Sequence, residues 1–228
     1  MRQKALYLGI VLLIVVVIVV IVTGFGSKEK GDAEMGVSAA VALTESHIEG
    51  LVTSMQVMAL TNEVQSADWG TIEPLLAEFE EDSIPLVAWF ALPDASYYTV
   101  DTGLASGNLS DREYFPVVMG GDTAVGYTVV SKSTGRESTV AAVPVKDGSA
   151  VIGALGASIY LDELSQSIVD DLRLSDDIVF YAVDGNGVIT LHSDADMIME
   201  NASDQDDLCD AESAASSLLG WTFYFGYE

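Results

Sequence analysis

The sequence has few basic residues and a single cysteine. It holds 9 Lys and Arg against 35 Asp and Glu, which gives a net charge of −26 at pH 7. Nucleic-acid binding needs a basic patch for the phosphates, so the composition argues against a nucleic-acid partner. Cys209 alone cannot form an intrachain disulfide, so the fold depends on its core. Half of the 228 residues are apolar, which allows such a core, and the acidity indicates a solvated surface suited to a salty medium.

Motifs of nucleophilic catalysis are also lacking. The segment GASIY at residues 156–160 departs from the nucleophile-elbow pattern at its last position, and no P-loop or HExxH motif occurs. Only His47 and His192 offer an imidazole base, and a lone histidine in a helix, such as His47, is typical of a structural role. A hydrolase would have to depend on Ser158 or His192. We therefore predict that the chain is not an enzyme and carries no cofactor.

A metal site is not indicated either. Residues 184–187 read DGNG and resemble the start of a calcium loop, but Val188 stands where the next oxygen ligand is needed. Asp-Gly and Asn-Gly pairs tolerate positive φ, so this segment predicts a hairpin turn. The acidic cluster at residues 204–207 is interpreted as solvated, with weak cation binding as its alternative.

One long apolar run lies near the N-terminus, at residues 5–22. About 18 helical residues span about 27 Å, close to the hydrocarbon thickness of a bilayer. The alternative is a cleaved signal peptide, but residues 22–26 make a poor cleavage site. We predict an uncleaved single-pass anchor over residues 1–26. The basic residues Arg2 and Lys4 place the N-terminus in the cytoplasm and the rest of the chain outside it.

The residues after the anchor predict a long helix followed by a mixed α+β domain. From about residue 33 to 67 apolar residues recur at steps of three and four without a proline, which indicates a helix with an apolar core or dimer seam. Further helices are expected over residues 72–81 and 161–174, and residues 193–217 are interpreted as loop or weak helix. Strand-like apolar runs bounded by turn residues predict strands at 86–91, 97–100, 126–131, 138–145, 150–160, 177–184, 188–192 and 221–227.

The order of these segments resembles the Cache class of extracellular sensor domains, which have PAS-like folds and occur on chemoreceptors and sensor kinases. The resemblance rests on LSDREYF, SKSTGRESTVAAVPV, VIGALGASIYLDEL, IVFYAVDGNGVITLHSD and GWTFYFG, in that order after the long helix. It implies a double Cache layout, with a long helix at 33–70, a membrane-distal PAS-like antiparallel sheet at 71–165 and a membrane-proximal α+β module at 166–228. Strands that usually precede the last tryptophan strand are not evident, so the second module is expected to be shortened.

The same resemblance implies a small-molecule pocket in the distal module. Arg112 matches the family arginine that grips a ligand carboxylate, and Tyr114 and Phe115 match the adjacent aromatic walls. A guanidinium binds a carboxylate with two parallel hydrogen bonds, which supports the role on chemical grounds. The alternative for Arg112 is a surface ion pair with Asp111 or Glu113. Further wall residues are proposed from neighbouring strands, with plain core packing as their alternative: Trp89, Tyr98, Tyr127 and Ser131.

The expected ligand is a carboxylate without an ammonium group. The resemblance implies that amino-acid-binding members place an aspartate on the strand that corresponds to residues 153–160. Here that strand reads GALGASIY and contains no acid.

The sequence therefore predicts a membrane-anchored extracytoplasmic sensor of a small organic anion in signal transduction. The long helix is expected to support a homodimer and to pass the signal to a membrane partner. The alternative is a structural or protein-interaction module that kept the fold without a ligand.

Overall fold

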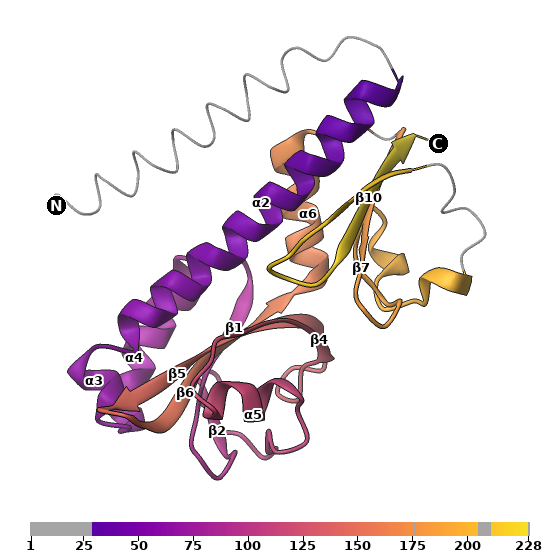
Figure 1. The fold of residues 1–228 in the computed structure, drawn as a ribbon. Helices are drawn as coiled ribbons and strands as arrows, with labels where there is room; N and C mark the ends of the chain where they lie inside the picture. Colours follow the sequence, from indigo (N-terminus) through magenta and orange to yellow (C-terminus); the bar gives the residue numbers. More distant parts are fainter. Residues whose placement is uncertain (1–28, 176, 205–210, 228) are drawn as a thin grey trace, which may run out of the picture.

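A computed structural model describes residues 29–175, 177–204 and 211–227 of the chain. Its longest element is α2 (Glu29–Met58), which runs along one side of both sheets (Figure 1). The apolar stripe predicted for this helix is confirmed, because its residues at three- and four-residue steps are buried: Val37, Ala40, Ile48, Leu51 and Met55. The predicted anchor at residues 5–22 lies outside the described residues. Within the described part of the chain, no helix is both long and apolar enough to cross a bilayer.

The chain leaves α2 earlier than the predicted residue 67, because capping residues start new helices there. The Thr61 hydroxyl donates to the Met58 carbonyl and accepts from the Val64 N–H, which begins α3 (Asn62–Gln65). Asp68 then accepts from the Gly70 N–H at the start of α4 (Trp69–Glu81). Side-chain acceptors at these positions satisfy N–H groups that a helix start leaves unpaired.

Sheet A is antiparallel, and its strands lie in the order β3-β2-β1-β6-β5-β4. The strands are β1 (Leu86–Ala91), β2 (Tyr97–Thr99), β3 (Gly103–Leu104), β4 (Ala124–Val130), β5 (Glu137–Asp147) and β6 (Ala150–Tyr160). The predicted strands are all present. The short strand β3 and the helix α5 (Tyr114–Met119) are not among the predicted elements.

The two faces of sheet A are buried against different partners. One face packs Ala88, Phe90 and Leu155 into the core that α2 shares with sheet B. The other face, with Trp89 and Ala142, packs against α5 and the loop before it. We call this second face the outward face of sheet A, because it points away from α2 (Figure 1).

Sheet B is smaller and has the strand order β8-β7-β10-β9. It is reached through α6 (Leu161–Leu172), and its strands are β7 (Ile178–Val183), β8 (Ile189–His192), β9 (Glu212–Ala215) and β10 (Thr222–Tyr227). Two short 3-10 helices, Ala195–Met197 and Ala202–Asp204, follow β8. The segment predicted as loop or weak helix therefore contains a strand, β9, whose ESAA sequence has few strand-forming residues. The expected shortened second module and the division at residue 165 stay predictions, and that division falls within α6.

The two sheets meet where β4 touches the β9–β10 hairpin. The Trp221 indole N–H donates to the Gly126 carbonyl at 3.1 Å, and Trp221 is almost fully buried. Gly126 has φ of 79°, and a Cβ built there would lie 2.4 Å from the Leu219 carbonyl oxygen. Only glycine permits both this backbone conformation and this approach.

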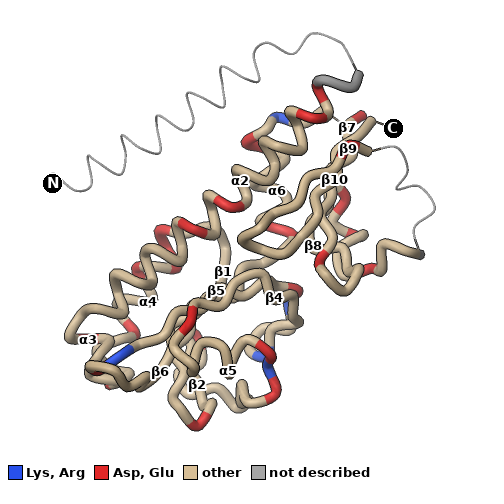
Figure 2. Tube along the Cα trace, in the orientation of Figure 1, with Lys and Arg blue, Asp and Glu red and all other residues tan. Residues whose placement is uncertain are grey.

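The described basic residues are sparse. Figure 2 shows acids along α2 and around both sheets, with Lys and Arg at a few separate places. Basic side chains that the structure describes are Arg112, Lys132, Arg136, Lys146 and Arg173. Arg136 donates to Asp162 at 2.6 Å and covers the Tyr160 ring.

Candidate functional site

Three aromatic rings predicted as pocket walls meet on the outward face of sheet A. Trp89 lies on β1, Tyr114 opens α5 and Tyr127 lies on β4. The ring centroids of Trp89 and Tyr114 are 5.9 Å apart, and those of Tyr114 and Tyr127 are 6.0 Å apart in an edge-on arrangement. Segments that are distant in sequence thus contribute to one aromatic cluster.

Small residues on β6 make room for this cluster. Trp89 is paired across the sheet with Gly156, and a Cβ on that glycine would lie 2.1 Å from the indole. The indole therefore lies flat against the strand. Ala154 belongs to the same buried cluster.

Arg112 lies at the edge of this cluster and is only partly exposed. One of its Nη atoms donates to the Val130 carbonyl at 2.6 Å, and its Nε is buried without a hydrogen-bond partner. A buried N–H without an acceptor costs free energy, roughly 1–3 kcal/mol, which an incoming acceptor would recover. This guanidinium therefore offers an unused donor to an anion.

The alternative ion pair of Arg112 with Asp111 is not the one formed. The Asp111 carboxylate instead accepts from the Lys132 ammonium at 2.5 Å, and this hydrogen bond lowers the pKa of Asp111. Lys132 also donates to the Asn108 carbonyl at 2.6 Å. Lys132 thus fastens the loop that carries Arg112 and leaves the guanidinium free of a carboxylate among the described residues.

Two phenol groups lie near Arg112. Burial raises the pKa of Tyr114 and of Tyr97, and the positive charge of Arg112 opposes the shift in both. The nearby Ser133 hydroxyl also opposes the rise in the pKa of Tyr97. Both phenols therefore remain protonated near neutral pH and can donate hydrogen bonds to an anion beside Arg112.

Tyr97 lies near Arg112 in the outward cluster, whereas the sequence interpretation chose Tyr98 as a wall residue. Tyr98 pairs with Phe90 across the sheet, and its ring stacks on Trp69 of α4 at 5.1 Å, on the face toward α2. Tyr97 pairs with Ala91 and belongs to the outward cluster. Neighbouring side chains of a strand point to opposite faces, so only one of the two tyrosines can reach Arg112.

The other two predicted wall residues lie next to the cluster. Phe115 is buried within it, and its N–H donates to the Arg112 carbonyl at 3.0 Å. Ser131 is also buried. Its hydroxyl is 3.2 Å from that of Ser133, and its N–H donates to the Arg136 carbonyl, so it shapes the β4–β5 turn.

The chemistry gathered here suits binding. The cluster offers one guanidinium, two protonated phenols and serine hydroxyls, and its strand residues are apolar or small. Within the part of the chain that the structure describes, no group of His, Cys, Asp and Glu residues could hold a metal ion.

The two residues considered for hydrolysis lie on different sheets. Ser158 is on β6 of sheet A, whereas His192 ends β8 of sheet B. The His192 Nδ1 accepts from the Asp194 N–H at 2.8 Å, so this nitrogen is occupied within its own turn.

Comparisons with known proteins concern the fold. No protein-family model and no curated protein matches the chain. Solved structures do match it at low sequence identity. The ligand-binding domain of the Pseudomonas fluorescens chemoreceptor CtaA, in complex with L-serine, is 13% identical with a TM-score of 0.64, over 86% of this chain and 94% of that one. The sensor domain of the Vibrio cholerae histidine kinase DctB is 12% identical with a TM-score of 0.59, over 84% and 95%.

A third match is the ligand-binding domain of the Pseudomonas aeruginosa amino-acid chemoreceptor PctB, in complex with L-Arg. It is 17% identical with a TM-score of 0.59, and the match covers 86% of this chain and 91% of that one. These structural neighbours are Cache-type ligand-binding sensor domains of chemoreceptors and histidine kinases. The chain thus has the Cache fold that its sequence resembles.

Proposed function

We propose that this chain is the extracytoplasmic sensor of a small carboxylate, bound on the outward face of sheet A and gripped by Arg112. The observation that carries the proposal is the Arg112 guanidinium, which has a buried Nε without an acceptor and no carboxylate partner among the described residues. The structural neighbours bind L-serine and L-Arg according to their names, which supports a small organic ligand.

The proposed ligand lacks an ammonium group. The residues of β6 that share the outward face are Ala154, Gly156 and Ser158, none of which carries a charge to meet an amine. Of the two carboxylates next to Arg112 in sequence, Asp111 is occupied by Lys132, and Glu113 forms no ion pair among the described residues. A simple carboxylate, a 2-hydroxy acid or a 2-oxo acid fits this set better than an amino acid.

The experiment is a thermal unfolding series of the full chain in detergent micelles with acetate, lactate, pyruvate, L-serine and L-alanine. A ligand at 100 times its Kd stabilises the native state by about 2.7 kcal/mol, which raises Tm by roughly 5–10 °C for a chain of this size. We expect such a shift in Tm with at least one of acetate, lactate and pyruvate, and a smaller shift with L-serine and L-alanine. A larger shift with the amino acids contradicts the proposed ligand class.

Variants of Arg112 test whether the ligand-induced shift in Tm arises from binding at this residue. Arg112→Ala should abolish it, and Arg112→Lys should retain only part of it, because an ammonium lacks the two-pronged geometry. Arg136→Gln is the matched control, since it removes a cation that already pairs with Asp162. A ligand shift that survives in Arg112→Ala rules out this arginine as the anchor.

A second candidate is a structural or protein-interaction module, and one observation favours it. Trp89, Tyr114 and Tyr127 pack against one another, so the cluster is filled by its own rings. Absence of any shift across the panel, together with unchanged melting of Arg112→Ala, would favour this second function.

The anchoring and assembly follow from the same proposal. We propose that residues 5–22 hold the domain to the membrane, with the N-terminus in the cytoplasm. We also propose that α2 forms a homodimer seam and passes the signal to a membrane partner. Met35 and Val57 of α2 are about half exposed, which leaves apolar surface for a second helix. Sedimentation of the full chain in detergent, with and without ligand, tests the dimer.

A further inference from the structure

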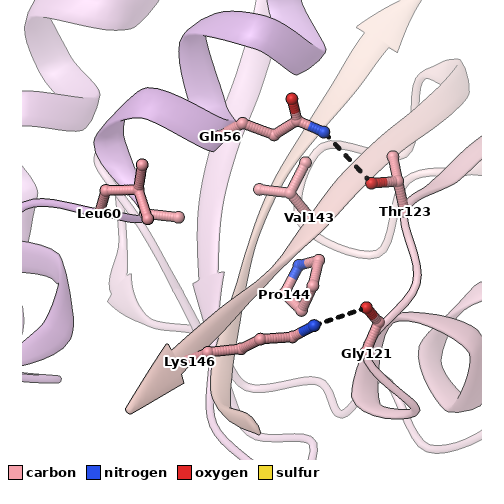
Figure 3. A pocket seen from close by; sticks show the side chains of 8 residues that line it. Gln56, Leu60, Gly121, Thr123, Val143, Pro144 and Lys146 are labelled. Carbon is pink, nitrogen blue, oxygen red and sulfur yellow. Dashed lines mark hydrogen bonds between the residues drawn. The ribbon is translucent and has the colours of Figure 1, made fainter. Parts of the chain in front are cut away.

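A cleft lies at the C-terminal end of α2, and none of its lining residues belongs to the Arg112 cluster. It has a volume of about 330 Å³ and is open to solvent on one side. Its walls come from the last turn of α2 and the turn after it (Gln56, Ala59, Leu60), from β5 (Val143, Pro144, Lys146) and from the loop after α5 (Gly121, Thr123) (Figure 3). This volume falls in the range of sites for small molecules.

Lys146 is the only charged residue that lines this cleft. Its ammonium donates to the Gly121 carbonyl at 3.0 Å, which fixes its position across the opening (Figure 3). No ion pair involves it among residues 29–175, 177–204 and 211–227. By contrast, Lys132 and Arg136 both hold carboxylates.

The cleft contains none of the chain's abundant acids. The sequence has 35 Asp and Glu residues, yet none of the eight lining residues is acidic. Asp122 lies between Gly121 and Thr123 in sequence but is exposed and does not line the cleft. An ammonium ion kept apart from acids in so acidic a chain leaves a place for an external anion.

The remaining walls define the rest of the ligand. Gln56 donates to the Thr123 hydroxyl at 3.5 Å, and the Gln56 side-chain oxygen points away from Lys146 (Figure 3). The Thr123 hydroxyl keeps its own proton to donate. Leu60, Val143 and Pro144 supply apolar surface, and Leu60 is 77% exposed. A carboxylate with a short aliphatic tail would pair with the ammonium and cover this apolar surface.

We propose that the cleft around Lys146 is a second ligand site, specific for short aliphatic carboxylates such as butyrate. An occupant would contact α2 and the loop after α5 at the same time. The site is separate from the Arg112 cluster and does not depend on ligand binding there.

The test counts binding sites on the full chain in detergent micelles by equilibrium dialysis with radiolabelled butyrate, with empty micelles as the blank. If both sites bind butyrate, the wild-type chain binds two molecules. Lys146→Met should bind one molecule, because its affinity for butyrate at the Lys146 site should fall by about tenfold or more. This loss is the equivalent of one charge-assisted hydrogen bond. Arg112→Ala should also bind one, and the double variant none.

Matched variants separate the effect of the positive charge at residue 146 from the effect of net charge on anion binding. Lys146→Arg keeps the cation and should keep the second molecule. Arg173→Gln removes one exposed positive charge at the end of α6 and should leave the count unchanged. Thr123→Val, which removes only a hydroxyl group, should weaken binding at this site and leave the other site intact.

The outcomes distinguish this proposal from the function proposed above. A wild-type count of one that falls to zero in Lys146→Met supports the Lys146 site and contradicts butyrate binding at Arg112. The Lys146 site is overturned if Lys146→Met binds as many molecules of butyrate as the wild type. The comparison requires that the circular dichroism and melting of the variant match those of the wild type. Equal loss in Arg173→Gln also overturns it, because the binding would then follow net charge alone.

Discussion

Sheet A and sheet B each turn one face toward α2, but their outward faces are filled in different ways. On sheet A the strand rings Trp89 and Tyr127 lie beside small residues such as Gly156, and the Tyr114 ring of α5 packs between the two strand rings. On sheet B the strands contribute their own rings, because Tyr224, Tyr181 and His192 pair across three neighbouring strands. Tyr181 stacks on Tyr224 at 4.6 Å and on His192 at 5.9 Å.

This difference shows where a ligand can enter at low cost. The Tyr114 ring above sheet A belongs to a short helix, and such a segment opens locally for less free energy than a hydrogen-bonded sheet. The rings on sheet B are fixed by strand pairing, so removing them from that face requires breaking the sheet. The proposed carboxylate site therefore lies on sheet A, and the stacked face of sheet B serves stability.

The largest effect on stability is expected at the contact between the two sheets. In Gly126→Ala the new methyl group would overlap the Leu219 carbonyl, and the positive φ would strain any residue with a Cβ. These two costs together should lower the free energy of unfolding by about 3 kcal/mol, or Tm by roughly 6–12 °C. Urea unfolding of the full chain measures the loss.

Gly135→Ala is the matched control for that prediction. Gly135 also has a positive φ, of 72°, but nothing lies within 4 Å of its Cβ position. It should lose only the backbone strain, about 1 kcal/mol. Similar losses in the two variants would mean that the contact between β4 and the β9–β10 hairpin contributes little.

The next prediction concerns the packing above sheet A. In Gly156→Ala the methyl group would meet the Trp89 indole, which must swing away from the strand. We expect a loss of about 2 kcal/mol in the free energy of unfolding, a change in tryptophan fluorescence and a smaller ligand-induced shift in Tm. The measurements are urea unfolding and emission spectra.

A glycine on the other sheet controls for the substitution itself. Gly185, in the β7–β8 turn, has open space around its Cβ position, so Gly185→Ala should change stability by no more than about 0.5 kcal/mol. If Gly156→Ala behaves in the same way, the outward face of sheet A has more room than the structure shows.

Much of this fold could be predicted from the sequence because its patterns are local. The apolar stripe of α2 and the nearly continuous apolar runs of β5 and β6 appear directly in the residue order. The helix α5 could not be found in this way, since six residues are too few to show a period. The strand β9 consists of small and polar residues, and it is a strand because it pairs with β10.

The candidate site could be predicted only in part from the sequence, for a related reason. Arg112 and its aromatic neighbours were marked by an ordered motif, and the structure brings Trp89, Tyr114 and Tyr127 together near it. The choice between Tyr97 and Tyr98 depended on the register of β2 against β1, which places Tyr97 opposite Ala91. A shift of one residue would exchange the two faces, and nothing in a three-residue strand fixes that register in advance.

The last prediction concerns the stacked face of sheet B. Burial lowers the pKa of His192, while the nearby Asp194 raises it in part, so the ring is held neutral in the native state. The unfolded chain gains a proton as the pH falls through about 6.5, and the native chain gains it only at a lower pH, so stability should fall on acidification. Protonation would also remove the acceptor that the Nδ1 atom presents to the Asp194 N–H.

We expect His192 to cost about 1 kcal/mol of stability between pH 7 and pH 5, measured by urea unfolding. His192→Asn retains a side-chain acceptor near the Nδ1 position without a titrating ring, so its stability should vary less over this range. Glu80, whose pKa is raised by burial, has the opposite effect and is present in both proteins. The difference between the two pH profiles therefore isolates His192. Identical slopes would show that the ring can become charged without leaving its stack. The face of sheet B would then be more adaptable than its strand pairing implies.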